Sequence, residues 1–139
     1  MNKLSKSLIG LFLVVATFAA QAELAVIVHP SNGTTLSKDD ITRIFLGKNR
    51  SFPGGGEAVP VAFAFSSKES EEFAGNVLSK TPKQLKAYWA KMIFTGQGTP
   101  PKEMDNAAQI LELVSKNPSL IGFVPAGSEN AGVKVVGKF

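Results

Sequence analysis

Residues 58–73 read AVPVAFAFSSKESEEF and place an apolar run directly before a polar, helix-forming one. Residues 58–65 have the β-branched and aromatic content of a strand. Ser66 stands three residues before Glu69, which is the spacing of a capping box at the start of a helix. A strand that passes straight into a helix is typical of α/β folds, so this stretch favours an α/β domain.

The segments on both sides continue the alternation of strands and helices. Residues 24–28 are a β-branched apolar run that stops before Pro30, as expected of a buried strand. Ser37 and Asp40 have capping-box spacing and predict a helix over 38–46. Further elements are expected as a helix opened by Ser66, a helix from Pro82, a helix from 105 or 106 to before Pro118, and strands over 120–124 and 132–136. The order β-α-β-α-α-α-β-β indicates a small mixed sheet flanked by helices, with at least one right-handed parallel crossover.

The strongest helix start lies at Thr81-Pro82, with Gln84 three residues after the cap. The apolar residues behind it recur at helical spacing and predict a wide stripe that packs in the core. The residues of this stripe are Leu85, Tyr88, Trp89, Met92 and Ile93.

The first 22 residues have the pattern of a secretory signal peptide. Lys3 and Lys6 precede an apolar run over 8–20. Ala20 and Ala22 form the small-residue pattern that precedes a cleavage site, which predicts cleavage after Ala22. The run is shorter than the ~20 residues a membrane span requires, which disfavours an anchor. We therefore expect a signal peptide over 1–22 and one exported, periplasmic domain over 23–139, not membrane-spanning after cleavage.

Composition limits the chemistry that is expected. Residues 23–139 hold 13 Lys and Arg against 11 Asp and Glu, a net charge of +2 spread along the chain, which gives no argument for nucleic-acid binding. The chain has no cysteine and a single histidine, His29, so no disulfide, His-containing triad or Cys or His metal cluster is expected. We predict no enzyme activity, no catalytic residues, no metal and no cofactor.

The Ser66-Ser67 junction is the remaining candidate site. Free backbone N–H groups and the positive end of a helix dipole can bind an anion there. The alternative is that the serines only cap the helix, and local sequence favours that alternative.

The order of several motifs resembles the second lobe of the periplasmic phosphate-binding proteins (PstS-like) that serve ABC transporters. The motifs are Ile44 to Lys48, Val59 to Val61, Ser67 with Phe73, Tyr88-Trp89 with Phe94 to Gly96, and Asn117 to Pro125. The resemblance covers about 24–136. It implies one lobe of the type II periplasmic binding protein fold, with an oxyanion such as phosphate as ligand.

Two departures from the family predict weak binding. Those relatives hold phosphate between two lobes, whereas one lobe is expected here. Of the Arg-x-x-x-Ser-Gly-Thr anion motif only Ser67 is kept, because Phe63, Lys68 and Glu69 stand at the Arg, Gly and Thr positions. We expect a shallow site if the two strand-to-helix loops lie side by side, or one completed by a second copy in a homodimer. Its residues would be Ser31, Asn32, Thr34, Thr35, Ser66 and Ser67.

Two functions therefore stay open. The first is capture of phosphate or a related oxyanion for an ABC permease. The second is an accessory module that docks on another envelope protein without binding phosphate.

Overall fold

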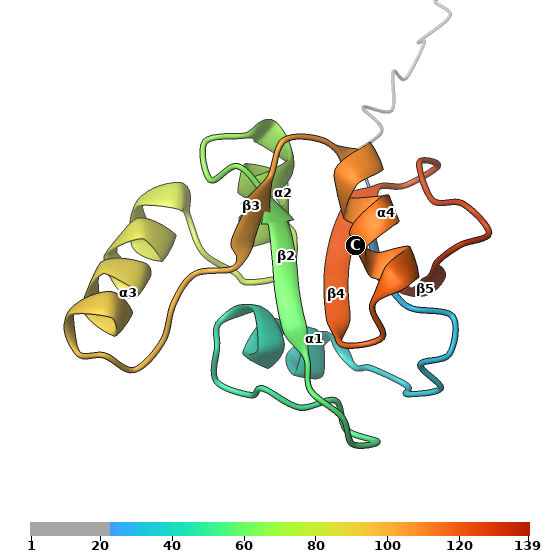
Figure 1. The fold of residues 1–139 in the computed structure, drawn as a ribbon. Coiled ribbons are helices and arrows are strands. Elements are labelled where there is room, and N and C mark those ends of the chain that lie inside the picture. Colours follow the sequence, from blue (N-terminus) through green and yellow to red (C-terminus); the bar gives the residue numbers. More distant parts are fainter. Residues whose placement is uncertain (1–22) are drawn as a thin grey trace, which may run out of the picture.

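The computed structural model describes residues 23–139, and the expected signal peptide lies outside the described residues. The chain folds as a mixed sheet flanked by helices (Figure 1). The strands are β1 (Leu24–Val28), β2 (Val59–Phe63), β3 (Lys102–Met104), β4 (Leu120–Pro125) and β5 (Lys134–Lys138), and the helices are α1 (Lys38–Phe45), α2 (Lys68–Asn76), α3 (Pro82–Phe94) and α4 (Ala107–Lys116).

The five strands lie in the order β3-β2-β4-β1-β5. The central strand β4 is parallel to β2 and antiparallel to β1. β3 is parallel to β2, and β5 is antiparallel to β1. Consequently β1 runs opposite to β2, and the carboxyl ends of these two strands lie at opposite edges of the sheet.

Both faces of the sheet are covered, with α4 on one face and α1 and α2 on the other (Figure 1). Every residue of β1 is buried. The rings of Phe73 and Phe123 stack at 4.0 Å between centroids and join α2 to the sheet. On the opposite face Gly122 allows α4 to approach closely, because a Cβ at Gly122 would lie 2.8 Å from a methyl carbon of Ile110.

The two ends of the described chain meet. The Leu24 N–H donates to the Phe139 carbonyl at 2.8 Å, and the Phe139 N–H donates back to the Leu24 carbonyl at 2.9 Å. The Ala126 N–H donates to the Glu23 carbonyl at 2.9 Å, which ties the loop after β4 to the same place. These hydrogen bonds hold the first and last residues of the described fold next to each other.

Helix starts follow the predicted capping chemistry at α1 and α3. Both predicted capping boxes form, one from Ser37 with Asp40 and one from Thr81 with Gln84. The backbone N–H and hydroxyl of Ser37 both donate to the Asp40 carboxylate, and these bonds lower the pKa of that carboxyl.

The predicted start of α2 is wrong by one residue. The cap is Ser67, whose hydroxyl oxygen accepts from the Ser70 N–H at 3.1 Å, and not Ser66. The Ser67 N–H donates to the Ala64 carbonyl at 2.9 Å, so a turn comes between strand and helix. Because this turn shifts the cap, the third helical position is Ser70, and Glu69 does not complete a capping box.

Strand β3 was not expected. It is only three residues long and follows Pro100 and Pro101, yet it pairs in parallel with residues 61–63 of β2. The observed order is β-α-β-α-α-β-α-β-β.

The predicted stripe on α3 is buried only in part. Leu85 and Trp89 are buried, and Tyr88 and Met92 are partly buried against the core. Ile93 is 57% exposed, which makes its predicted burial wrong, and Phe94 is 92% exposed. The reason is visible in Figure 1, where α3 lies at one side of the molecule, so that its last turn meets little of the domain. Within residues 23–139 no helix combines the length and apolar character that a membrane crossing needs.

Candidate functional site

The strands β2, β3 and β4 run parallel and end at one edge of the sheet. Ligands of open α/β sheets bind outside the carboxyl ends of the strands. The segments at this edge are residues 64–67 after β2, 105–106 after β3 and 126–129 after β4. Two helices also begin here, α2 capped by Ser67 and α4 capped by Asn106. This edge, which we call the carboxyl edge, is the candidate functional site.

The serine junction at this edge is stabilised from within the chain. Ser67 caps α2 through the Ser70 N–H, and the Ser70 hydroxyl donates to the Phe63 carbonyl at 3.0 Å. Ser66 is exposed and Ser67 is half-buried. Both residues are therefore at least partly accessible to solvent.

The backbone N–H group that precedes these serines is already hydrogen-bonded to a carboxylate. Glu103, in β3, accepts a hydrogen bond from the Phe65 N–H at 2.7 Å. A bound oxyanion would compete for this N–H group and would feel the negative charge of Glu103. The carboxylate is therefore an internal competitor for any anion at the carboxyl edge.

The loop after β4 adds a second acceptor. The Glu129 carboxylate accepts from the Gly127 N–H at 2.8 Å and lies 3.8 Å from the Lys138 ammonium. Its pKa is lowered, first by hydrogen bonds from the N–H groups of Glu129 itself and Gly127, and then by Lys138. The residue that follows Ser67 in the sequence is a lysine, Lys68. Its ammonium lies 3.6 Å from the Glu72 carboxylate. Carboxylates at this edge thus weaken its attraction for anions.

The other predicted ligand residues lie elsewhere. Ser31, Asn32 and Thr34 line a cavity of about 410 Å³ with residues 54–57 and 118–119, and Thr35 is not in its lining. The Asn32 side-chain oxygen accepts from the Thr34 N–H, and the Lys134 ammonium donates to the Asn32 carbonyl.

The structure does not bring the two predicted loops together. Val28, at the end of β1, pairs with Ile121, and so does Pro60, near the start of β2. From Pro60, β2 continues for three more residues to Phe63, roughly 10 Å at the rise of a strand, before the turn that contains Ser66 begins. The expectation of one site shared by both loops is wrong, because β1 and β2 are antiparallel.

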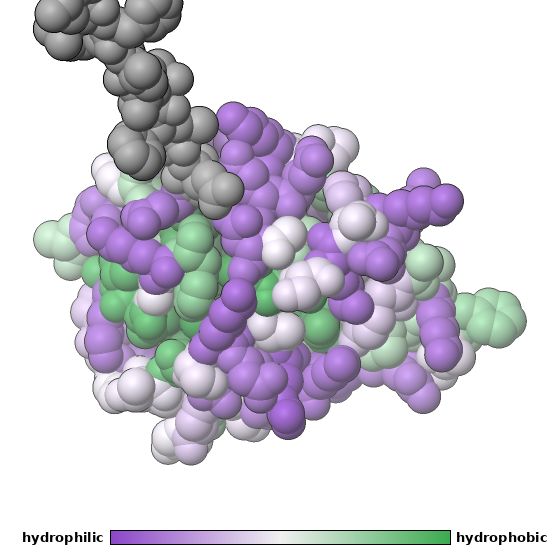
Figure 2. Space-filling model, turned by 180° about the vertical axis from the view of Figure 1, so that it is seen from behind, coloured by the Kyte–Doolittle hydropathy of each residue, from purple (hydrophilic) through white to green (hydrophobic). Residues whose placement is uncertain are grey.

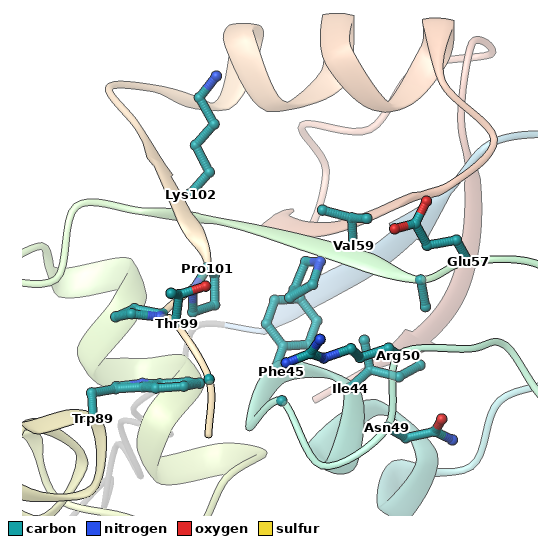
Figure 3. Close-up of a pocket in the computed structure, with 15 residues that line it drawn as sticks. Ile44, Phe45, Asn49, Arg50, Glu57, Val59, Trp89, Thr99, Pro101 and Lys102 are labelled. Carbon is teal, nitrogen blue, oxygen red and sulfur yellow. The ribbon is translucent and has the colours of Figure 1, made fainter. Parts of the chain in front are cut away.

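A second cavity lies at the amino ends of β2 and β3 and has a volume of about 330 Å³. Figure 3 shows Trp89 and Arg50 reaching into it from opposite sides, with Pro101 and Val59 along its wall. The arginine in its lining, Arg50, is near the amino end of β2, whereas Ser66 follows the carboxyl end of this strand. Arg50 therefore does not contribute to the carboxyl edge. Within residues 23–139 no three His, Asp or Glu side chains are grouped as a metal site would require.

The strand order and the helices on both faces define the fold class of the described chain, an α/β domain built on a five-stranded mixed sheet. Comparison with solved structures is consistent with this class. An ABC-type phosphate transport receptor from Vibrio cholerae matches with a TM-score of 0.54 and 16% identity, over 83% of this chain and 46% of that one. A phosphate ABC transporter substrate-binding protein with bound phosphate from Clostridium perfringens matches with a TM-score of 0.62 and 20% identity, over 83% and 45%. PstS from Borrelia burgdorferi matches with a TM-score of 0.62 and 14% identity, over 83% and 47%.

These matches confirm the expected fold, which is that of about half of a PstS-type binding protein. The chain spans less than half the length of the solved proteins that it matches. No protein-family model and no curated protein sequence matches it.

Proposed function

We propose that this chain is an exported, non-enzymatic binding protein that holds a small oxyanion such as phosphate weakly. The observation that carries the proposal is the position of Ser66 and Ser67. They lie at the carboxyl edge, at the amino end of α2, in a fold that matches half of a protein with bound phosphate. We assign the ligand contacts to these two serines and the adjacent N–H groups.

Weak affinity has two physical causes in this proposal. Glu103 already accepts from the Phe65 N–H, so an entering anion must displace it or lie beside it. The chain also corresponds to about half of its structural relatives, so the described residues supply contacts to one side of the ligand only. Ser31, Asn32, Thr34 and Thr35 would contribute only from a second copy of the chain, since they lie at the opposite edge.

Titration calorimetry of residues 23–139 with phosphate at neutral pH tests the proposal. We expect a dissociation constant in the high micromolar range or above. Ser67→Asp is the informative variant, because aspartate also caps helices but places a negative charge at the site. This substitution should abolish the heat of phosphate binding, while the melting temperature stays near that of the parent. A nanomolar constant, or unchanged binding by Ser67→Asp, would contradict the proposed site.

The second candidate function is an accessory module that docks on another envelope protein without binding phosphate. It is favoured by Phe65, which is 38% exposed beside Ser66 at the carboxyl edge. Sedimentation velocity with and without phosphate separates the two. Dimerisation that requires phosphate supports oxyanion capture, whereas a sedimentation coefficient indifferent to phosphate, together with no calorimetric signal, supports docking.

A further inference from the structure

The outward face of α3 is basic and ends in exposed apolar side chains. Leu85 and Trp89 face the domain and are buried. The opposite side of the helix presents Lys83, Lys86, Ala87, Ala90, Lys91 and Phe94, all of them exposed. We call these six residues the α3 face.

Positive charge is concentrated in the segment that contains this face. Residues 73–102 hold five lysines and no aspartate or glutamate, a net charge of +5. The rest of residues 23–139 holds 8 Lys and Arg against 11 Asp and Glu, a net charge of −3. Three of these lysines lie on α3, and the Lys80 ammonium lies 5.4 Å from the centroid of the Tyr88 ring, whereas Lys102 lies beside α4. Four of the five positive charges are therefore on or against α3.

The end of α3 is apolar as well as exposed. Phe94 is 92% exposed and Ile93 is 57% exposed, directly after Lys91. α3 forms the left side of the molecule in Figure 1, and this side, which is on the right in the reversed view of Figure 2, carries a hydrophobic projection beside hydrophilic surface. Ile93 and Phe94 together form an exposed apolar end beside the lysines of α3. Exposed apolar surface next to polar residues is a feature of protein and membrane interaction sites.

We propose that the α3 face docks on an anionic phospholipid bilayer surface, with Phe94 and Ile93 entering the interface and the lysines contacting the headgroups. Lysine-rich faces with Phe or Leu beside them bind membranes in this way, without spanning them. A bilayer is favoured over a protein partner by the type of cation, because all five cations of the segment are lysine. Lysine is depleted at protein–protein interfaces, whereas arginine is enriched there.

A second copy of the chain is a poor occupant of this face. A two-fold contact would bring the lysines of one α3 against those of the other, and like charges repel. A lipid surface instead offers many negative charges to a convex helix end and needs no pocket to receive Phe94.

Flotation with lipid vesicles tests the inference, using residues 23–139 so that the apolar stretch 8–20 is absent. This fragment contains every described element of the fold and its whole described core. We expect binding to vesicles of phosphatidylglycerol mixed with phosphatidylcholine, and little binding to phosphatidylcholine alone. Raising the salt from about 0.1 M to about 1 M shortens the Debye length from ~10 Å to ~3 Å and should release most of the protein.

Variants separate the charged and apolar contributions. Each lysine at an anionic surface is expected to contribute about fivefold, so Lys83→Gln with Lys86→Gln should weaken vesicle binding by about 25-fold. The matched control is Lys68→Gln with Lys116→Gln, which removes the same charge from exposed lysines on α2 and α4. Phe94→Ser should weaken binding by about tenfold, while Phe94→Leu keeps most of it.

All of these side chains are exposed, so the variants should melt like the parent. Equal binding to neutral and anionic vesicles would overturn the inference. So would absence of vesicle binding, which would leave an acidic protein as the partner, or a control pair that loses as much binding as the α3 pair.

Discussion

Glu103 provides the sharpest test of how the carboxyl edge treats anions. Its carboxylate accepts from the Phe65 N–H at 2.7 Å, beside the two serines assigned to the ligand. Glu103→Gln keeps an oxygen that can accept this hydrogen bond but removes the charge. Glu103→Ala removes both and leaves the N–H group open to a ligand.

The expected gain in affinity follows from Coulomb's law. A ligand charge roughly 6 Å from the Glu103 carboxylate is repelled by about 3 kcal/mol at an effective dielectric of ~20, and by about 0.7 kcal/mol in bulk water. Glu103 is exposed, so a value near 1 kcal/mol per unit of ligand charge is appropriate. Phosphate carries between one and two charges at neutral pH. Binding should therefore be about five- to thirtyfold tighter in Glu103→Gln.

Calorimetric titration with phosphate, run in parallel on the parent and the variants, measures this gain. Glu112→Gln is the matched control, because it removes one exposed carboxylate from α4. Glu103→Ala should bind at least as tightly as Glu103→Gln, since it also frees the N–H group. Unchanged or weaker binding in both Glu103 variants would refute the role of this carboxylate as an internal competitor. A gain in Glu112→Gln of equal size would show a general charge effect instead.

Three further predictions concern stability. Gly122→Ala would press a methyl group onto Ile110 and Val61, and urea denaturation should show a loss of about 1–3 kcal/mol. Thr81→Ala removes the cap of α3 and should lose about 1 kcal/mol in the same assay, whereas Thr81→Ser should lose little. The pKa of Glu129 is lowered in the folded state, so its contribution to stability is present above the unfolded pKa and is lost as the pH falls through the folded value. In Glu129→Gln the acid-induced loss of stability, followed by urea denaturation at several pH values, should be smaller.

Side chains close in sequence are sufficient to predict most of the helices and strands. The caps of α1 and α3 depend on side chains within three residues of the helix start, so the sequence predicts Ser37 and Thr81 as caps. The apolar run of β1 predicted complete burial, and that is what the structure shows. The cap of α2 was misplaced because the turn from Ala64 to Ser67 inserts one residue, and both serines have the same capping chemistry.

The positions of the candidate site residues depend on how strands distant in the sequence pair, and local sequence patterns do not predict that pairing. Hydrophobic periodicity identifies β1 and β2 as strands but does not give their relative direction, and that direction separates Ser31 from Ser66. β3 is short and pairs with residues 41 positions earlier in β2, so the sequence does not place Glu103 beside Phe65. The exposure of Phe94 likewise depends on where α3 lies relative to the sheet.

The reciprocal hydrogen bonds between Leu24 and Phe139 have a consequence for protein architecture. A domain whose entry and exit strands are neighbours can be inserted into a host chain, or joined to a second lobe, through two short adjacent linkers without disturbing any element. A brief glycine and serine bridge should likewise close this polypeptide into a ring, and new termini could be opened in the exposed glycine turn at 54–56. The described fold therefore has the geometry of an insert that a larger chain can carry through two adjacent linkers.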